Sequence, residues 1–348
     1  LNTRLVETAR HNLGINTTSY LDNLLLNPTV AFEFQRGMIR QQGIPAVYSK
    51  LLRNTNIEGT VSTLQELQVD EEWMFKLGEF GANETQASWE LQLKQREFKN
   101  VIDKNTSNTT FKNFAFFESY FSNYIEGTRF EVEEAKNIIE TDTPMFNRDE
   151  DSHDILGTYK LVSSKVEMNI TPSKPDEFIA ILQYRHRLLM EARKSKMPGV
   201  FKDKNNRAGE TFFVDFELVK GTLIKGFDYY KALTDPFAKA AYIMFMVSEI
   251  HPFLDGNGRI ARVMMNAELV KAEQTRIIIP TVYRDDYLGA LRRLTRQQDP
   301  LAYIKMLQRS QEFSATLNAV SLEELELLLE SSNAFKEYDE AKLKIMVQ

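Results

Sequence analysis

The 348-residue sequence contains no cysteine, which excludes disulfide bonds and metal sites built from thiolates. It holds only four histidines, His11, His153, His186 and His251, and no two of them have the spacing of a zinc-binding helix. A structural zinc site is therefore not expected. Any bound metal ion should be a hard cation held by oxygen ligands.

Long apolar runs are also absent. The longest, near residues 240–247, covers about eight residues, far short of the roughly 20 that cross a bilayer. No basic stretch followed by an apolar one is visible near the first residues, so we expect a cytoplasmic protein. The formal net charge of -6 disfavours non-specific binding to nucleic acid, so neither nucleic acid nor a membrane is an expected partner.

Helical periodicity dominates the sequence that is present. It predicts a mainly α fold, a helical bundle around a central helix, with one β-hairpin at 205–214 where Gly209 and Glu210 separate two short extended stretches. We divide the chain into an N-terminal helical module (1–105), a core domain (106–310) and a C-terminal helical segment (311–348). The polar stretch 103–110 is interpreted as the linker at the first of these boundaries, and the acidic stretch 141–154 as a loop within the core.

The most informative segment is HPFLDGNGRIAR, residues 251–262, which follows an almost wholly apolar helical stretch. Pro252 disfavours helical geometry at His251, so the central helix should end there and a new helix should begin near Arg259. The free N–H groups and positive dipole of a helix start bind anions, and Arg259 and Arg262 add planar donors for phosphate oxygens. Asp255 supplies a carboxylate where Mg²⁺ is usually held beside phosphates, and His251 suits a general base. The segment therefore predicts transfer chemistry on the phosphates of a nucleotide.

Three other interpretations of this segment were weighed. A calcium-binding EF-hand fails because Arg259, Ile260 and Asn266 stand where the loop needs an oxygen ligand, a glycine and a glutamate. A P-loop fails because the sequence has no GxxxxGK[ST] motif. A purely structural corner between helices accounts for the glycines and the asparagine, but not for two arginines beside a carboxylate.

The segment resembles the HxFx[DE]GNGRxxR signature of Fic-domain proteins, with every signature position filled, and the likeness extends over roughly residues 110–305. The resemblance implies a Fic fold and transfer of AMP from ATP, with Mg²⁺, to a Ser, Thr or Tyr hydroxyl of a target protein, and to the chain itself. It implies that His251 is the base, that Asp255 holds the metal, and that Phe253 is a core anchor. The phosphate-binding residues that it implies are Gly256, Asn257, Gly258, Arg259 and Arg262. A kinase branch of the family carries Ala and Lys at the positions of Gly256 and Gly258, so this chain looks like the AMP-transferring branch.

A second motif lies earlier, in SNYIEG. Ser122 and Glu126 are four residues apart on one face of a helix expected over 112–127, and Gly127 suits its left-handed end. A carboxylate in the last turn opposes the helix dipole, so a partner such as an arginine is expected. The spacing resembles the inhibitory [ST]xxxE[GN] motif of Fic proteins with an N-terminal inhibitory helix, which implies that Glu126 pairs with Arg262.

The remaining expectations concern ligands and partners. The hairpin residues Gly209, Glu210, Thr211 and Phe212 resemble the family's flap, on which an extended target segment docks, and Tyr287 matches a position that flanks adenine. A structural hairpin and a buried aromatic side chain remain the alternatives. A homodimer is a further expected partner. The alternative functions are removal of AMP from modified proteins and a catalytically silent interaction module.

Overall fold

The computed structural model describes Leu93 and residues 96–209, 211–297 and 299–345. Most of the expected N-terminal module, residues 1–105, lies outside the described residues, and so does Glu210 of the expected hairpin. Within the described part, helices dominate and the only sheet has two antiparallel strands. The predicted fold class, mainly α with one β-hairpin, is confirmed.

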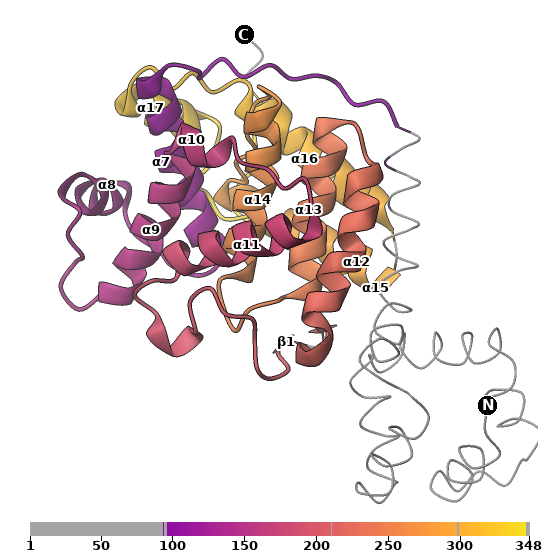
Figure 1. Cartoon of the computed structure of the whole chain (residues 1–348). Coiled ribbons are helices and arrows are strands. Elements are labelled where there is room, and N and C mark those ends of the chain that lie inside the picture. Colours follow the sequence, from indigo (N-terminus) through magenta and orange to yellow (C-terminus); the bar gives the residue numbers. More distant parts are fainter. Residues whose placement is uncertain (1–92, 94–95, 210, 298, 346–348) are drawn as a thin grey trace, which may run out of the picture.

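Two packed helices, α13 (Pro236–Ile250) and α14 (Asn257–Lys271), form the centre of the molecule (Figure 1). Asp235 caps α13 by accepting a hydrogen bond from the backbone N–H of Ala238 at 2.9 Å, and Pro236 occupies the first helical position, where no N–H is needed. The apolar interior of α13 is buried on all sides, as the sequence predicts for a central helix.

The other helices surround this pair. One side, on the right in Figure 1, is formed by α12 (Val219–Ala232), α15 (Arg284–Gln297) and α16 (Pro300–Ser314). Helix α11 (Pro175–Leu189) crosses the front. The opposite side is formed by α7 (Asn108–Ile125), α8 (Val132–Thr141), α9 (Asp149–Val162), α10 (Lys165–Met168) and α17 (Leu322–Ser331). The domain boundary expected at residue 310 falls within α16. The predicted domain limits stay predictions.

Helix α7 is buried on two faces. Phe111, Ala115 and Ile125 join the core cluster around α13 and α14, whereas Phe114, Phe117 and Phe121 join a second cluster with α17 and the chain after it. A buried polar group also fixes α7 to its neighbours, because the Glu118 carboxylate accepts from Asn266 of α14 and pairs with Arg276, each at 2.8 Å. The helix that carries the Ser122–Glu126 motif is therefore held rigidly against α14.

Two loop predictions differ from the structure. Helix α7 begins at Asn108, inside the expected linker, because Ser107 caps it by accepting from the N–H of Thr110 at 3.1 Å. Helix α9 begins at Asp149, inside the expected acidic loop, because its three first-turn carboxylates lie at the positive end of the helix dipole. The acidic composition predicts a solvated loop, but these residues form the first turn of a helix.

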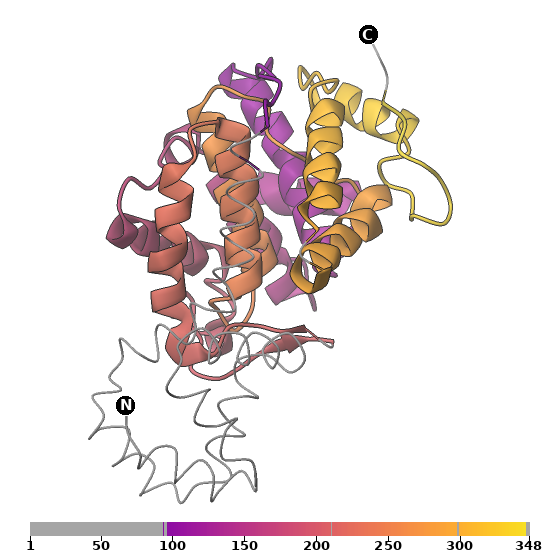
Figure 2. The ribbon, with the colours of Figure 1, turned by 90° about the vertical axis from the view of Figure 1, so that its right-hand side faces the viewer.

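The hairpin consists of β1 (Arg207–Ala208) and β2 (Thr211–Phe212), with Ala208 paired to Thr211. Gly209 has φ of 57°, which suits the first position of a two-residue turn. The hairpin lies at one end of the helices (Figure 2). The chain before it is tied to the signature segment, since Lys202 N–H donates to the Pro252 carbonyl at 2.8 Å and Asn206 Nδ2 to the Phe253 carbonyl at 2.9 Å.

Candidate active site

The loop between α13 and α14 is built to turn sharply and then start a helix. His251 ends α13 in the left-handed conformation, at φ of 52°, and Gly256 precedes α14 at φ of 73°. A Cβ at Gly256 would approach the Met190 sulfur to 2.7 Å, so both the conformation and the packing require glycine. The Asn257 side chain closes the loop on itself by accepting from Phe253 N–H at 2.8 Å and donating to the Phe253 carbonyl at 2.9 Å. The side-chain amide of Asn257 therefore shapes the loop, and the backbone N–H of Asn257 lies at the start of α14. That start is Asn257, two residues before the expected Arg259.

The His251 ring has one fixed tautomer. Its Nδ1 donates to the Ser248 carbonyl at 3.0 Å, which places the proton on Nδ1 and the free lone pair on Nε2. Its ring stacks on Phe213, with 3.6 Å between ring centroids. Burial lowers the pKa of His251 to about 4, against a weaker raising effect of the Ser248 bond. The imidazole is therefore neutral at physiological pH and able to accept a proton.

Glu126 lies over the start of α14. Its Oε1 accepts from Arg262 Nη2 at 2.7 Å, and a side chain at Gly258 would collide with the Glu126 carboxylate. Ser122 supports the same arginine, with Oγ accepting from Nε at 3.0 Å and its carbonyl from Nη2 at 2.8 Å. Gly127, at φ of 96°, ends the helix as expected. The structure thus brings together Ser122, Glu126, Gly258 and Arg262.

Arg262 is almost fully buried and stays charged. Burial lowers the pKa of Arg262, but the Glu126 carboxylate and the Tyr287 hydroxyl raise it by more, so its pKa lies above the ordinary value. Tyr287 is 1% exposed, and its hydroxyl lies 3.3 Å from Arg262 Nη1. In this structure the Tyr287 hydroxyl therefore accepts a hydrogen bond from Arg262. Its expected place beside adenine stays a prediction.

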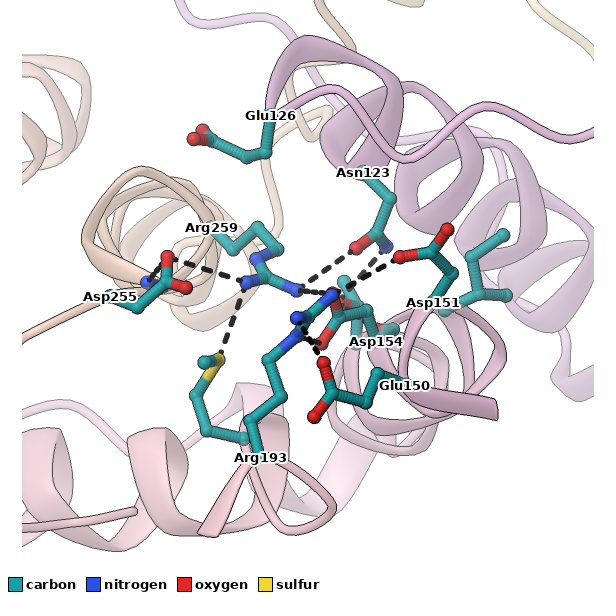
Figure 3. A network of polar contacts seen from close by, with 12 residues as sticks. Asn123, Glu126, Glu150, Asp151, Asp154, Arg193, Asp255 and Arg259 are labelled. Atoms are coloured by element: carbon teal, nitrogen blue, oxygen red, sulfur yellow. Dashed lines mark hydrogen bonds and ion pairs between the residues drawn. The ribbon is translucent and has the colours of Figure 1, made fainter. Parts of the chain in front are cut away.

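Arg259 points in another direction. Its Nη1 lies 2.8 Å from Asp154 Oδ2, and its Nη2 lies 3.9 Å from Asp255 Oδ1 (Figure 3). The Asp255 carboxylate accepts from Gly256 N–H at 2.7 Å and is 40% exposed, so part of it faces outward. Among the described residues no three His, Asp or Glu side chains gather into a metal site. A lone carboxylate of this kind suits Mg²⁺, which keeps several waters and takes its other ligands from phosphates.

The hairpin lies beside His251. Phe212 is exposed, and Thr211 Oγ1 accepts from Arg296 Nη2 of α15 at 3.0 Å. Phe213, directly after the expected flap residues, makes the stacking contact with His251. A hairpin is therefore present next to His251 at the predicted position, with Gly209 in its turn and Glu210 outside the described residues, and its role as a flap stays a prediction.

Sequence reasoning missed three contributors to the site: Phe213, Asp154 and His186. Fully buried His186 stacks on Phe253 at 3.6 Å and lies 3.0 Å from the Asp255 carbonyl. The sequence predicts a loop at Asp154, whereas the structure places Asp154 on α9, where its carboxylate pairs with Arg259. No local pattern marks these residues, because only the packing of α9, α11 and the hairpin brings them to the loop.

In the part of the chain that the structure describes, no helix is long and apolar enough to cross a membrane.

Comparisons with known proteins agree with this geometry. The model of the Fic/DOC family matches residues 179–269, which include the loop and most of α14. A Fido domain-containing protein of Dictyostelium discoideum is 31% identical over 99 residues, which are 27% of this chain and 69% of that protein. The chain belongs to the Fic/DOC family.

Two further relatives are similar over different extents. The protein adenylyltransferase Fic of Drosophila persimilis is 36% identical over 72 residues, which are 21% of this chain but only 14% of that protein. The solved structure of Fic-1 from C. elegans, residues 134–508, has a TM-score of 0.49 at 15% identity, and the match covers 93% of this chain and 95% of that chain.

Proposed function

We propose that the protein is an autoinhibited protein adenylyltransferase, which transfers AMP from ATP to a hydroxyl side chain of a target protein. The observation that carries the proposal is the joint placement of a neutral base, a helix start and a carboxylate-bound arginine within one short segment. Relatives that are similar to about a fifth of this chain are named protein adenylyltransferases. The match covers only 14% of the length of such a relative, so the support for activity and substrate comes from the site residues of this chain.

His251 Nε2 takes the proton of the attacking hydroxyl as its oxygen forms a bond to the α-phosphorus of ATP. The bond from that phosphorus to the bridging oxygen breaks, and pyrophosphate leaves with the electron pair. The backbone N–H groups of Asn257 and Gly258 and the positive end of α14 bind the α- and β-phosphates, and Gly256 N–H, which donates to Asp255 in this structure, joins them once that bond is released. Arg259 and Arg262 neutralise further phosphate charge, and Arg262 takes the γ-phosphate. Asp255 holds Mg²⁺, which neutralises charge on the phosphates when bound.

Glu126 makes the resting state inhibited. Its carboxylate occupies the space over Gly258 and already pairs with Arg262, so the γ-phosphate meets a negative charge instead of a free guanidinium. Ser122 strengthens this arrangement by orienting Arg262. The nucleotide then binds with its α-phosphorus away from His251, and transfer is slow.

The target protein docks on the hairpin. The strands around Gly209 offer backbone groups to an extended segment, and Thr211 and Phe212 lie beside it. The accepting residue is a Ser, Thr or Tyr, the chain also modifies itself, and a homodimer is a further proposed partner.

The first prediction concerns Glu126. Replacing it (Glu126→Gly) should raise AMP transfer by about a hundredfold, because Arg262 and the space over Gly258 become free. The measurement is labelling of the protein itself and of a lysate by ATP carrying the label on the α-phosphate. Glu133→Gly, an exposed position on α8, is the matched control and should leave labelling unchanged. Equal labelling of the parent and the Glu126→Gly protein would contradict inhibition, and transfer of a γ-label instead would make the protein a kinase.

The second prediction tests the base. In the Glu126→Gly protein, His251→Ala should lower transfer by about 10³-fold, within the range for loss of a general base. ATP affinity, measured by calorimetry, should change little because the backbone anion site and both arginines remain. Transfer that persists at the parent rate would remove His251 from this role.

One alternative function has a specific observation in its favour. The Glu126 side chain is 33% exposed and lies at the helix start, where it can orient a water for removal of AMP from a modified protein. Glu126→Gln would then abolish release of AMP from a labelled target while leaving the ability to bind it. Under the main proposal the same variant increases labelling instead. A catalytically silent interaction module is a further alternative, and it predicts no labelling in any variant.

A further inference from the structure

Arg259 is held by one edge of its guanidinium. Nη1 pairs with Asp154 Oδ2 at 2.8 Å and also faces Asn123 Oδ1 at 3.4 Å, so both of its protons are directed at α9 and α7 (Figure 3). The whole residue is 3% exposed. The side chain therefore has a fixed orientation before any ligand arrives.

The other edge of the same guanidinium is not satisfied. Nε has no hydrogen-bond partner among the described residues, and Nη2 has only the Met190 sulfur at 3.3 Å. The nearest carboxylate oxygen to Nη2, on Asp255, lies 3.9 Å away, beyond hydrogen-bond reach. A buried charged donor without a strong acceptor is costly, and the Nε–Nη2 edge has the geometry that binds two oxygens of one anion.

Asp154 is itself anchored from behind. Its side chain is 3% exposed and is shared by two arginines, because Arg193 donates to it from Nε at 3.0 Å and from Nη2 at 2.7 Å. Arg193 also pairs with Glu150 at 2.7 Å and Asp151 at 3.2 Å, both on α9. The hydrogen bonds to Asp154 raise the pKa of Arg193 above its ordinary value, so Arg193 keeps its charge. Asp154 therefore stays fixed between two permanent cations.

We propose that Asp154, held by Arg193, is a positioning residue for Arg259. By holding Nη1, it turns the Nε–Nη2 edge toward Asp255, where a phosphate group of the nucleotide takes the two free donors. This inference rests on the proposed function for the identity of the ligand. Arg262 lies with Glu126 and Ser122 instead, so the two arginines of the signature segment are positioned by separate elements: Arg259 mainly by α9, and Arg262 by α7.

The test measures ATP affinity with Mg²⁺ by calorimetry in the Glu126→Gly chain. Asp154→Asn, which keeps the shape and removes the charge, should weaken ATP binding by about tenfold, because Arg259 is no longer held in the binding orientation. In a chain that also carries Arg259→Gln, Asp154→Asn should have no further effect, since nothing remains to be positioned. A merely structural role of Asp154 would instead weaken binding equally in both backgrounds.

Asp151→Asn is the matched control. Asp151 lies on the same helix and pairs with Arg193, but it does not contact Arg259. It should leave ATP affinity within about twofold of the parent. Asp154→Asn that binds ATP as tightly as the parent, or a loss that is the same with Arg259→Gln present, overturns the proposal.

A second variant keeps the test decisive if Asp154→Asn does not fold. Arg193→Gln leaves the ion pair of Asp154 and Arg259 in place and removes the outer anchor, so ATP binding should weaken by about threefold, again only when Arg259 is present. Unchanged affinity would overturn the proposal. Because the readout is binding, a chain that binds ATP but transfers no AMP disproves the proposed function without affecting this result.

Discussion

The two histidines of the site, fully buried His186 and partly buried His251, have opposite tautomers. His186 Nδ1 accepts from Gly199 N–H at 2.9 Å, so its Nε2 carries the proton and donates to the Asp255 carbonyl. His251 carries its proton on Nδ1 and keeps Nε2 free. One ring therefore shapes the loop and the other is available for chemistry. The difference is set by which backbone group faces each ring, and the residue type alone does not predict it.

His186 makes stability depend on pH. Burial lowers the pKa of His186 to about 4, and Arg259 lowers it further, whereas Asp255 raises it. A histidine in the unfolded chain has a pKa of about 6.5. Between these values the unfolded state binds more protons, so the free energy of unfolding falls as the pH drops from about 6.5 toward 4 and is fully recovered above 6.5. His251 acts in the same direction, since its pKa is also lowered to about 4.

We expect His186→Gln to make the free energy of unfolding depend less on pH, because one of the two histidines with a lowered pKa is removed. The lowered pKa corresponds to about 3 kcal/mol that the parent loses across the window and the variant keeps. Urea unfolding at several pH values from 7.5 to 4.5 measures it. His153→Gln is the control, because the His153 side chain is 42% exposed, and it should follow the parent. Identical slopes for the parent and His186→Gln would show that His186 does not carry the effect.

Residues of the site were predictable where a contiguous pattern carried them. His251, Asp255, the glycines and both arginines lie in one segment, and the resemblance of Ser122 and Glu126 to the inhibitory motif implies an arginine opposite Glu126. The structure places Glu126 on Arg262, as the second motif implied. The sequence does not predict which contacts each side chain of the site makes. Asn257 is turned into the loop, Arg259 is bound to Asp154, and Tyr287 lies under Arg262.

At the scale of helices and strands, predictions succeeded where an end is marked by local chemistry. Helix α13 ends at His251, before Pro252, and α7 ends before Gly127, both as the sequence predicts. The predictions are wrong where polar or acidic composition alone predicts a loop, because α7 and α9 begin inside the predicted linker and the predicted acidic loop. Polar residues at a helix start resemble a loop in composition, and only their cap bonds and dipole contacts tell the two apart.

The second motif depends on how firmly α7 is held at its carboxyl end. Arg284 Nε donates to the Ile125 carbonyl at 3.1 Å, and the Tyr124 hydroxyl donates to Glu337 Oε1 at 2.5 Å. Phe335 stacks on Phe121 with 5.2 Å between ring centroids. Segments that follow the signature in sequence therefore fix the helix end from which Glu126 extends. The position of Glu126 over Gly258 is a result of tertiary packing and could not be read from the helix itself.

For the whole molecule, the two core clusters share one helix. Helix α7 buries one set of side chains against the cluster of α13 and α14 and another against the cluster of α17. The buried pair of Glu118 and Arg276, with Asn266, crosses the same region. Because neither cluster is complete without α7, the described part of the chain should unfold as one cooperative unit.

Phe117→Ala tests this cooperativity. Phe117 is fully buried in the second cluster, so its truncation should cost about 3–5 kcal/mol. Native-state hydrogen exchange should then show faster exchange of the α13 amides, although α13 belongs to the other cluster, together with those of α17. Phe146→Ala, at a side chain that is 90% exposed, should change neither. Faster exchange confined to α7 and α17 would mean that the clusters open separately, and the position of Glu126 would then not be tied to the stability of α13 and α14.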